Sequence, residues 1–194
     1  MATQLYLLRH GSTDVEPGTL VGSTDVGLNG KGLARLAEFG RQLEDVEVWY
    51  CSPMLRTRQT LDELRRHISI RQEISYDDRL REIDFGRWEM LSFAGISKLD
   101  PDLIDSWTRH TDFVFPGGEA VAGFCERVET MLQLFMAHDA EKIAVITHGG
   151  VIRTLICLAL GISVRNYLLF EVQPASLTVF ELFDKGGVLK GLNL

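Results

Sequence analysis

Short apolar runs alternate along the chain with longer segments in which apolar residues recur every three or four positions. Three runs have the length and composition of buried strands, at residues 5–8, 46–51 and 143–147. Four segments have a helical period: residues 29–43, 52–67 and 119–138, and a segment that opens at Gly149. Alternating strands and helices predict an α/β fold, a three-layer sandwich with a mainly parallel central sheet and helices on both faces.

Polar and turn-forming residues set the expected boundaries of these elements. Asn29 is expected to cap the first helix, and Ser52 to cap the second, with Pro53 in its first position. Three further elements are expected: a short strand within residues 70–85, one or two short helices in residues 92–110 interrupted at Pro101, and a closing hairpin of residues 177–183 and 188–192. We expect one domain over residues 1–194, with a short helical insertion at about 88–116.

The charge balance narrows the range of partners. The net charge is −7, whereas a nucleic-acid-binding domain would present a basic patch. An anion site must therefore be a local basic pocket, and nucleic acid is not an expected partner. The longest apolar run, residues 151–162, is too short to cross a membrane and contains Arg153. The first residues lack a secretory pattern, and the three scattered cysteines suit free thiols in a reducing compartment, so a cytoplasmic location is expected.

Two predicted strands end in the same way, in Arg9-His10-Gly11 and Thr147-His148-Gly149. Because the carboxyl ends of parallel strands meet at one edge of a sheet, we expect His10 and His148 to lie close together. The glycine that follows each histidine lets the backbone approach an anion. Arg56 begins the helix after the second strand and belongs to the same edge, and guanidinium groups suit phosphate recognition.

Several motifs occur in a fixed order along the chain. They are Leu7 to Thr13, then Gly22, Asp25, Leu28 and Gly32, then residues 51–60, 80–89, 116–119 and 147–150. In this order they resemble the histidine phosphatase superfamily, also called the phosphoglycerate-mutase-like family, over nearly the whole chain. The resemblance implies the phosphoglycerate-mutase-like α/β fold, a small phosphate monoester as partner, and neither a metal nor a cofactor.

The resemblance also implies roles for individual residues. His10 is expected to be the nucleophile that becomes phosphorylated, and Glu82 to give a proton to the leaving oxygen and then to activate water. Arg9, Arg56 and His148 are expected to hold the phosphoryl oxygens. The expected substrate-binding set adds four residues to Arg9 and Arg56: Thr13, Gly22, Ser23 and Gly149.

The chemistry of these residues supports the same roles. Phosphoryl transfer needs positioning and charge neutralisation, which fixed arginines supply without a metal. Nearby positive charges lower the pKa of His10 and keep it neutral, as a nitrogen nucleophile must be. A bound phosphate dianion favours the protonated form of Glu82. The alternative for Glu82 is a salt bridge to Arg79 or Arg81.

Some positions depart from the family pattern. Glu16 stands where members often have asparagine, so we expect it to point away from a phosphate or to contact a leaving group. Ala120 replaces a common serine, and Met90 replaces a common glycine. Trp88-Glu89-Met90 and residues 170–173 resemble the alpha-ribazole phosphatase branch, which implies alpha-ribazole 5′-phosphate as the substrate.

Alternative functions remain open at this point. A phosphoglycerate mutase or a sugar-phosphate phosphatase would use the same motif residues. A binding protein without catalysis is expected to have lost His10, Glu82 or His148, and all three are present. Metal-dependent hydrolysis needs clustered ligands, whereas His67, His110 and His138 are scattered. A homodimer is an alternative to a monomer.

The length of two segments favours a phosphatase over a mutase. A mutase must keep water from its phosphohistidine. The segment from Trp88 to Pro116 is short and the sequence ends at Leu194, which leaves little to form a lid. Trp107, Phe113 and Phe115 are expected either to stack on a heterocyclic leaving group or to pack a small helical subdomain onto the sheet.

Overall fold

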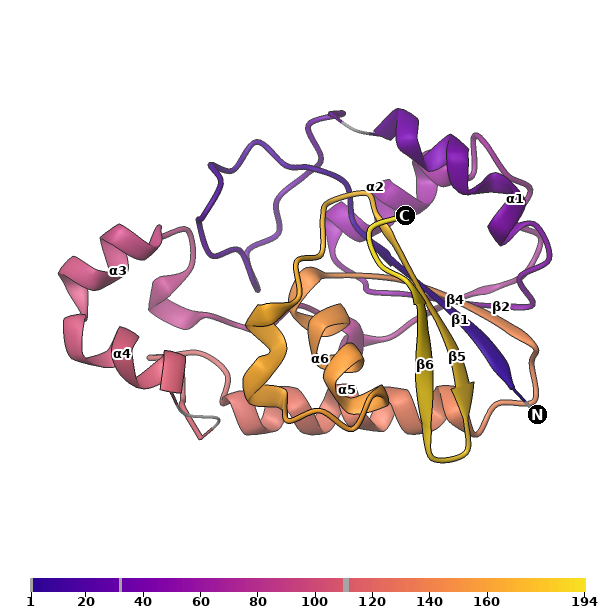
Figure 1. Cartoon of the computed structure of the whole chain (residues 1–194). Helices are drawn as coiled ribbons and strands as arrows, with labels where there is room; N and C mark the ends of the chain where they lie inside the picture. Colours follow the sequence, from indigo (N-terminus) through magenta and orange to yellow (C-terminus); the bar gives the residue numbers. More distant parts are fainter. Residues whose placement is uncertain (1, 32, 110–111) are drawn as a thin grey trace.

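The computed structural model describes residues 2–31, 33–109 and 112–194. Its centre is a six-stranded sheet in the order β3-β2-β4-β1-β5-β6 (Figure 1). The strands are β1 (Thr3–Arg9), β2 (Val48–Cys51), β3 (Ile74–Tyr76), β4 (Lys142–Thr147), β5 (Leu177–Phe183) and β6 (Gly186–Gly191). The first four strands are parallel, and β5 and β6 form an antiparallel hairpin at one edge. The expected mainly parallel sheet with a closing hairpin is confirmed.

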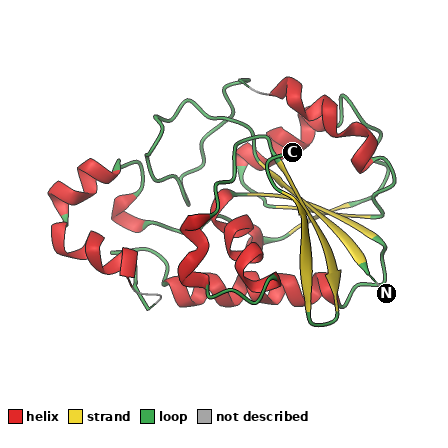
Figure 2. Cartoon of the chain, viewed as in Figure 1, coloured by secondary structure: helices red, strands yellow, loops and turns green. Residues whose placement is uncertain are grey.

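Helices cover both faces of the sheet, as expected (Figure 2). One face carries the 3-10 helix η1 (Leu33–Phe39), α1 (Gly40–Leu43) and α2 (Leu55–Leu64), and the other carries α5 (Val121–Met136) and α6 (Gly149–Ala159). Successive side chains of a strand point to opposite faces. Leu5 and Leu7 of β1 therefore pack in the core with α5 and α6, whereas Tyr6 and Leu8 pack with η1, α1 and α2.

The two helix starts expected on the face that carries η1, α1 and α2 differ from the observed ones. The first helix on this face is the 3-10 helix that begins at Leu33; the side chain of Asn29 lies before it, accepting from the N–H of Lys31 at 2.9 Å and donating to the carbonyl of Thr13 at 2.8 Å. The helix expected to begin at Ser52 starts at Leu55. Ser52 does not cap it, because its hydroxyl contacts Nε2 of His148 at 2.8 Å.

A smaller helical layer lies beyond the carboxyl end of the sheet (Figure 1). It contains α3 (Phe93–Leu99), α4 (Pro101–Arg109) and the 3-10 helix η4 (Val164–Leu169), and two more 3-10 turns, η2 (Asp78–Leu80) and η3 (Gly86–Trp88), lead into it. Pro101 is the first residue of α4, which confirms the expected interruption. Gly32 and His110 lie outside the described residues. Within the described part of the chain, no helix has the length and apolarity needed to cross a membrane.

Aromatic side chains join this layer to the sheet. Phe113 stacks on Trp88 with ring centroids 5.5 Å apart, and Phe115 meets Trp107 edge to face at 5.4 Å. The indole N–H of Trp88 donates to Asp100 at 2.7 Å, so its polar end is satisfied. Packing of the helical layer, one of the two expectations for these aromatics, is confirmed. The extent of one domain over residues 1–194 stays a prediction.

Candidate active site

The two histidines predicted to meet lie side by side at the carboxyl edge of the sheet. Arg9 pairs with Thr147 in the register of β1 and β4, and the next N–H, that of His10, donates to the carbonyl of Thr147 at 3.0 Å. The ring centroids of His10 and His148 are 5.2 Å apart, and both side chains are buried. Pairing of two parallel strands thus brings together residues that are far apart in the sequence.

The contacts of His10 fix its tautomer. Its Nδ1 lies 2.8 Å from the carbonyl oxygen of Gly11, and because a carbonyl only accepts, Nδ1 carries the proton. The lone pair of Nε2 is then available to a ligand. Burial, followed by the charges of Arg9 and Arg56, holds the pKa of His10 well below its ordinary value. His10 is therefore neutral at pH 7, which is the state that a nitrogen nucleophile requires.

Arg9 is a half-buried cation next to His10 in the chain, and its Nε atom is fully buried. One terminal nitrogen donates to the carbonyl of Val172, and its buried Nε has no partner among the described residues. Burial lowers the pKa of Arg9 to about 10, so it keeps its charge at pH 7. A Cβ at Gly149 would lie 3.3 Å from this Nε, so glycine lets the start of α6 approach the guanidinium closely. An unpaired buried donor of this kind suits an anionic ligand.

Arg56 and His148 form a second unit. Nε of Arg56 donates to Nδ1 of His148 at 3.2 Å, and its terminal nitrogens donate to the carbonyls of Thr24 at 3.0 Å and Gly22 at 2.8 Å. Because arginine only donates, the neutral His148 ring carries its proton on Nε2 and donates it to Ser52. Three of the five guanidinium N–H groups are used in this way, which fixes the orientation of the other two.

Glu82 faces the start of α6. Its Oε2 accepts from the N–H of Gly150 at 2.9 Å, and a Cβ at Gly150 would lie only 2.3 Å from its Oε1. The alternative salt bridges of Glu82 do not form, because Arg79 pairs with Asp77 and Arg81 with Asp78. The absence of a side chain at Gly150 thus leaves space for the carboxylate of Glu82.

A cavity of about 500 Å³ joins most of these groups. Its lining contains six of the residues predicted for catalysis or substrate binding: Arg9, His10, Thr13, Arg56, Glu82 and Gly149. His148 is not part of the lining, so the structure places it behind Arg56, and a direct contact with phosphate stays a prediction. Glu16 is exposed and also belongs to the lining of this cavity, so whether it avoids a phosphate or contacts a leaving group stays a prediction.

Gly22 and Ser23 were expected to bind substrate, but the structure gives them another position. They are absent from the cavity lining, the hydroxyl of Ser23 donates to Asp84 at 2.9 Å, and both N–H groups donate to Glu89. Their N–H groups are therefore engaged by Glu89, the carbonyl of Gly22 accepts from Arg56, and substrate binding by these two residues stays a prediction.

Sequence reasoning missed the role of Glu89 in this arrangement. Its carboxylate accepts the N–H groups of residues 22, 23, 24 and 85, as well as the hydroxyl of Thr24, at 2.7 to 3.2 Å. The carbonyls of Gly22 and Thr24 in turn accept from Arg56. Glu89 is thus a clamp on the loop that orients Arg56. The sequence does contain a signal for this role, because Glu89 belongs to the Trp88-Glu89-Met90 motif, but the motif by itself does not indicate which groups the carboxylate binds.

The described residues contain no group of three or more His, Cys, Asp or Glu side chains placed to hold a metal ion. All three cysteines are free, with Cys51 and Cys157 buried and Cys125 half-buried. The chemistry that the site offers is therefore that of a neutral histidine, two fixed guanidinium groups and one carboxylic acid.

This combination of sheet and site defines a class of protein: an α/β fold with a histidine–arginine pocket, suited to an anion, at the carboxyl edge of a parallel sheet. A model of the histidine phosphatase superfamily (branch 1) matches residues 5–194. The chain belongs to that superfamily, which confirms the resemblance seen in its motifs.

Comparisons with individual proteins agree on the family but differ in substrate. A bifunctional protein of Mycobacterium tuberculosis is 29% identical over 95% of this chain, and the chain spans about half (51%) of that relative's length. Phosphoserine phosphatase 1 of Hydrogenobacter thermophilus is 27% identical, over 98% of this chain and 92% of the relative. The crystal structure of the alpha-ribazole phosphatase from Shigella flexneri is 25% identical, with a TM-score of 0.84 over 99% of this chain and 96% of that one.

Proposed function

We propose that this chain hydrolyses phosphate monoesters through a phosphohistidine formed on His10, without a metal ion. The observation that carries the proposal is the state of His10: neutral, with Nδ1 committed to the carbonyl of Gly11 and Nε2 available beside Arg9. Few structural roles would require a buried, lowered-pKa histidine next to an unpaired buried guanidinium nitrogen.

The reaction has two steps. Nε2 of His10 attacks phosphorus, the bond to the ester oxygen breaks, and Glu82 gives its proton to the leaving alcohol. Water then attacks phosphorus, Glu82 accepts a proton from it, and the P–N bond breaks to release phosphate and restore His10. Arg9 and Arg56 neutralise the charge on the phosphoryl oxygens in both steps, and His148 orients Arg56.

For the substrate we propose alpha-ribazole 5′-phosphate. The support is the similarity to an alpha-ribazole phosphatase of solved structure, together with the short segment between Trp88 and Pro116, whose described residues include the short helices α3 and α4. A mutase requires a lid that excludes water from the phosphohistidine, and this segment is too short to supply a large one. A cytoplasmic location and a homodimer stay predictions.

The test measures phosphate release from p-nitrophenyl phosphate, alpha-ribazole 5′-phosphate, phosphoserine and 3-phosphoglycerate. Activity should persist in EDTA, orthovanadate should inhibit, and His10→Ala should lower kcat by about a thousandfold or more with the fold intact. Phosphate should be trapped on His10 after rapid quenching at neutral pH. Near-normal turnover of His10→Ala, or activity that chelation abolishes and Mg²⁺ restores, would refute the mechanism. Efficient isomerisation of 3-phosphoglycerate with little free phosphate would identify a mutase instead.

A further inference from the structure

Side chains of two other elements hold the segment that carries Glu82. Residues 79–82 comprise the end of η2 and the stretch that follows it, and they lie outside the strands of the sheet. Each of their four carbonyls nevertheless accepts a hydrogen bond from a side chain. The hydroxyl of Thr147, at the end of β4, donates to the carbonyl of Leu80 at 2.8 Å, and Arg127 of α5 donates to the other three. The position of Glu82 therefore depends on groups that are distant in the sequence.

Arg127 binds its three carbonyls through both of its terminal nitrogens. Nη1 donates to the carbonyls of Arg79 and Arg81, each at 2.7 Å, and Nη2 donates to the carbonyl of Glu82 at 3.2 Å. A guanidinium presents its N–H groups in one plane and at fixed angles. Three bonds from one such group therefore fix the carbonyls relative to one another and to α5.

Glu119 fixes the guanidinium of Arg127 in turn. Nε donates to Oε1 of Glu119 at 2.7 Å and Nη2 donates to Oε2 at 2.9 Å, so all five N–H groups of Arg127 have an acceptor. The same Oε2 accepts from the N–H of Asp84 at 3.3 Å, and the N–H of Glu119 donates to the carbonyl of Asp84 at 2.9 Å. The chain on either side of Glu82 is thus tied to one ion pair. Its two side chains are 19% and 24% exposed, so solvent screens it less than a surface pair.

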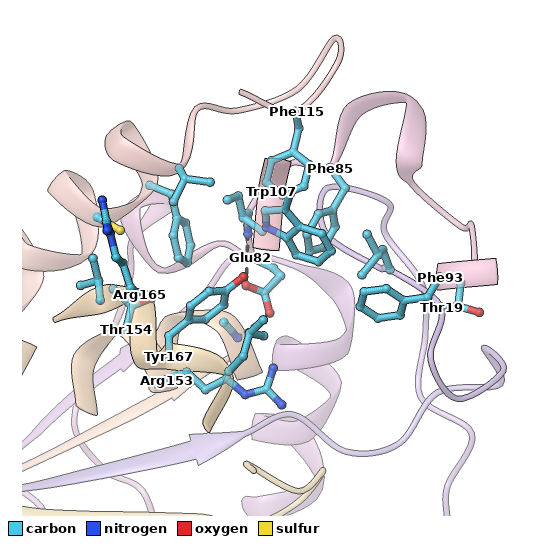
Figure 3. A pocket seen from close by; sticks show the side chains of 18 of the residues that line it. Thr19, Glu82, Phe85, Phe93, Trp107, Phe115, Arg153, Thr154, Arg165 and Tyr167 are labelled. Atoms are coloured by element: carbon cyan, nitrogen blue, oxygen red, sulfur yellow. Dashed lines mark hydrogen bonds between the residues drawn. The ribbon is translucent and has the colours of Figure 1, made fainter. Parts of the chain in front are cut away.

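The place of this ion pair relative to the cavities shows how it can act. Glu82 lines the cavity that contains His10 and also an adjoining cavity of about 400 Å³, where Figure 3 shows it among the lining side chains. Arg127 and Glu119 belong to neither lining. Their hydrogen bonds therefore reach a reaction at His10 through the segment that carries Glu82.

We propose that Arg127, held by Glu119, is a positioning residue for the proton donor Glu82. The inference rests on the proposed hydrolysis at His10 and adds the group that aims the acid. A general acid must lie within hydrogen-bond reach of the oxygen that it protonates, so a shift of about 1 Å in its backbone removes much of its effect. The motif at residues 116–119 thereby gains a physical role, because its last residue orients the arginine.

The experiment compares phenyl phosphate with p-nitrophenyl phosphate, two esters that differ only by a nitro group. Phenoxide needs a proton to leave far more than p-nitrophenoxide does, so a loss of proton donation lowers kcat/KM mainly for phenyl phosphate. Arg127→Met removes the N–H groups and keeps an unbranched apolar side chain. It should lower kcat/KM for phenyl phosphate at least about tenfold more than for p-nitrophenyl phosphate. Arg127→Lys, which retains the charge and three donors, should recover part of this selective loss.

Val128→Ala is the matched control for stability. Val128 follows Arg127 on α5 and is fully buried, so its truncation destabilises the core without removing a bond to residues 79–82. It should lower kcat/KM for the two esters by the same factor, and urea titration records the stability of every variant. Glu119→Gln should act in the same direction as Arg127→Met but less strongly, because its amide presents a donor to the guanidinium in place of one acceptor.

Glu82→Gln, measured in parallel, separates the inference from the proposed function. If Arg127→Met does not fold, Arg127→Lys and Glu119→Gln provide the same comparison. Equal or absent losses on the two esters in these variants, together with a selective loss in Glu82→Gln, would overturn the inference and leave the proposed function standing. Equal losses in Glu82→Gln would remove both the inference and the role proposed for Glu82. If the unaltered chain hydrolyses neither ester, the proposed function itself fails.

Discussion

Nε of Arg56 donates a hydrogen bond to Nδ1 of His148 across 3.2 Å, in the buried region behind the cavity wall. The same contact fixes the tautomer of His148 and the plane of the guanidinium. Burial, followed by the charge of Arg56, holds the pKa of His148 well below its ordinary value, so the ring can accept this bond at pH 7. In the proposed reaction, His148 therefore acts by orienting an arginine.

Two substitutions of His148 separate its contacts. His148→Asn keeps an acceptor near the position of Nδ1, whereas His148→Gln places its polar end near the position of Nε2, toward Ser52. If the bond to Arg56 is the important one, Asn should lower kcat/KM about tenfold and Gln about a hundredfold or more, because an arginine that loses its acceptor loses its fixed plane. The measurement is phosphate release from p-nitrophenyl phosphate. The reverse order of the two variants would contradict this role.

Glu89→Gln tests the clamp on the loop that carries the acceptors of Arg56. An amide keeps the shape of the carboxylate but replaces one acceptor oxygen with a donor that faces backbone N–H groups. The affinity for orthovanadate, a mimic of the transferring phosphoryl group, should fall about tenfold or more, with a parallel loss of kcat/KM. Glu129→Gln, at an exposed position of α5, is the control. A loss of stability with unchanged vanadate affinity would point to a purely structural Glu89.

Gly150→Ala tests the space that Glu82 needs. The new Cβ would lie 2.3 Å from Oε1 of Glu82, which is the far end of a flexible side chain, so the carboxylate should move while the fold persists. Release of phosphate from alkyl esters should fall about tenfold or more. Gly123→Ala on α5 is the comparison, because nothing lies within 4 Å of its Cβ. It should keep its activity and gain up to about 1 kcal/mol in unfolding free energy. Normal alkyl-ester activity in Gly150→Ala would contradict the placement of Glu82.

Glu82→Gln tests the proton donor directly. A good leaving group departs without a proton, whereas an alkoxide needs one. The loss of kcat should therefore be about a hundredfold or more on alkyl phosphates and far smaller on p-nitrophenyl phosphate. Steady-state kinetics on both esters gives the comparison. Equal losses on the two esters would show that Glu82 only holds the start of α6.

Stability should depend on pH through the two histidines. The folded-state pKa values of His10 and His148 lie below the unfolded value of about 6.5, so only the unfolded chain takes up these protons as the pH falls below it. The contribution of the two histidines to the free energy of unfolding should be constant above pH 7. Below about pH 6.5 it should decrease as the pH falls, by at most about 1.4 kcal/mol per pH unit for each ring. Urea titrations between pH 7.5 and 5 measure this, and His10→Asn should have a shallower slope. An unchanged slope would contradict the lowered pKa.

Much of the fold and the centre of the site could be predicted from the sequence. The apolar run at Leu5–Leu8 requires a strand buried on both faces, and two such strands that each end in His-Gly place His10 and His148 at one edge. These inferences held because they rest on local patterns and on the general geometry of parallel sheets. The order of the motifs along the chain also indicated the superfamily, because family members share these motifs in the same order.

Contacts between distant segments were decided only by the tertiary structure. Ser52 has the local pattern of a helix cap, but its hydroxyl contacts His148, and a buried hydrogen bond between remote residues outweighs a local cap. Gly22 and Ser23 belong to a family motif, and only the tertiary structure shows that their N–H groups donate to Glu89. Sequence alone determined which groups the site contains, because chemistry and chain order are local. Which of them meet a ligand and which orient a neighbour depends on burial and on the packing of segments that no local pattern relates.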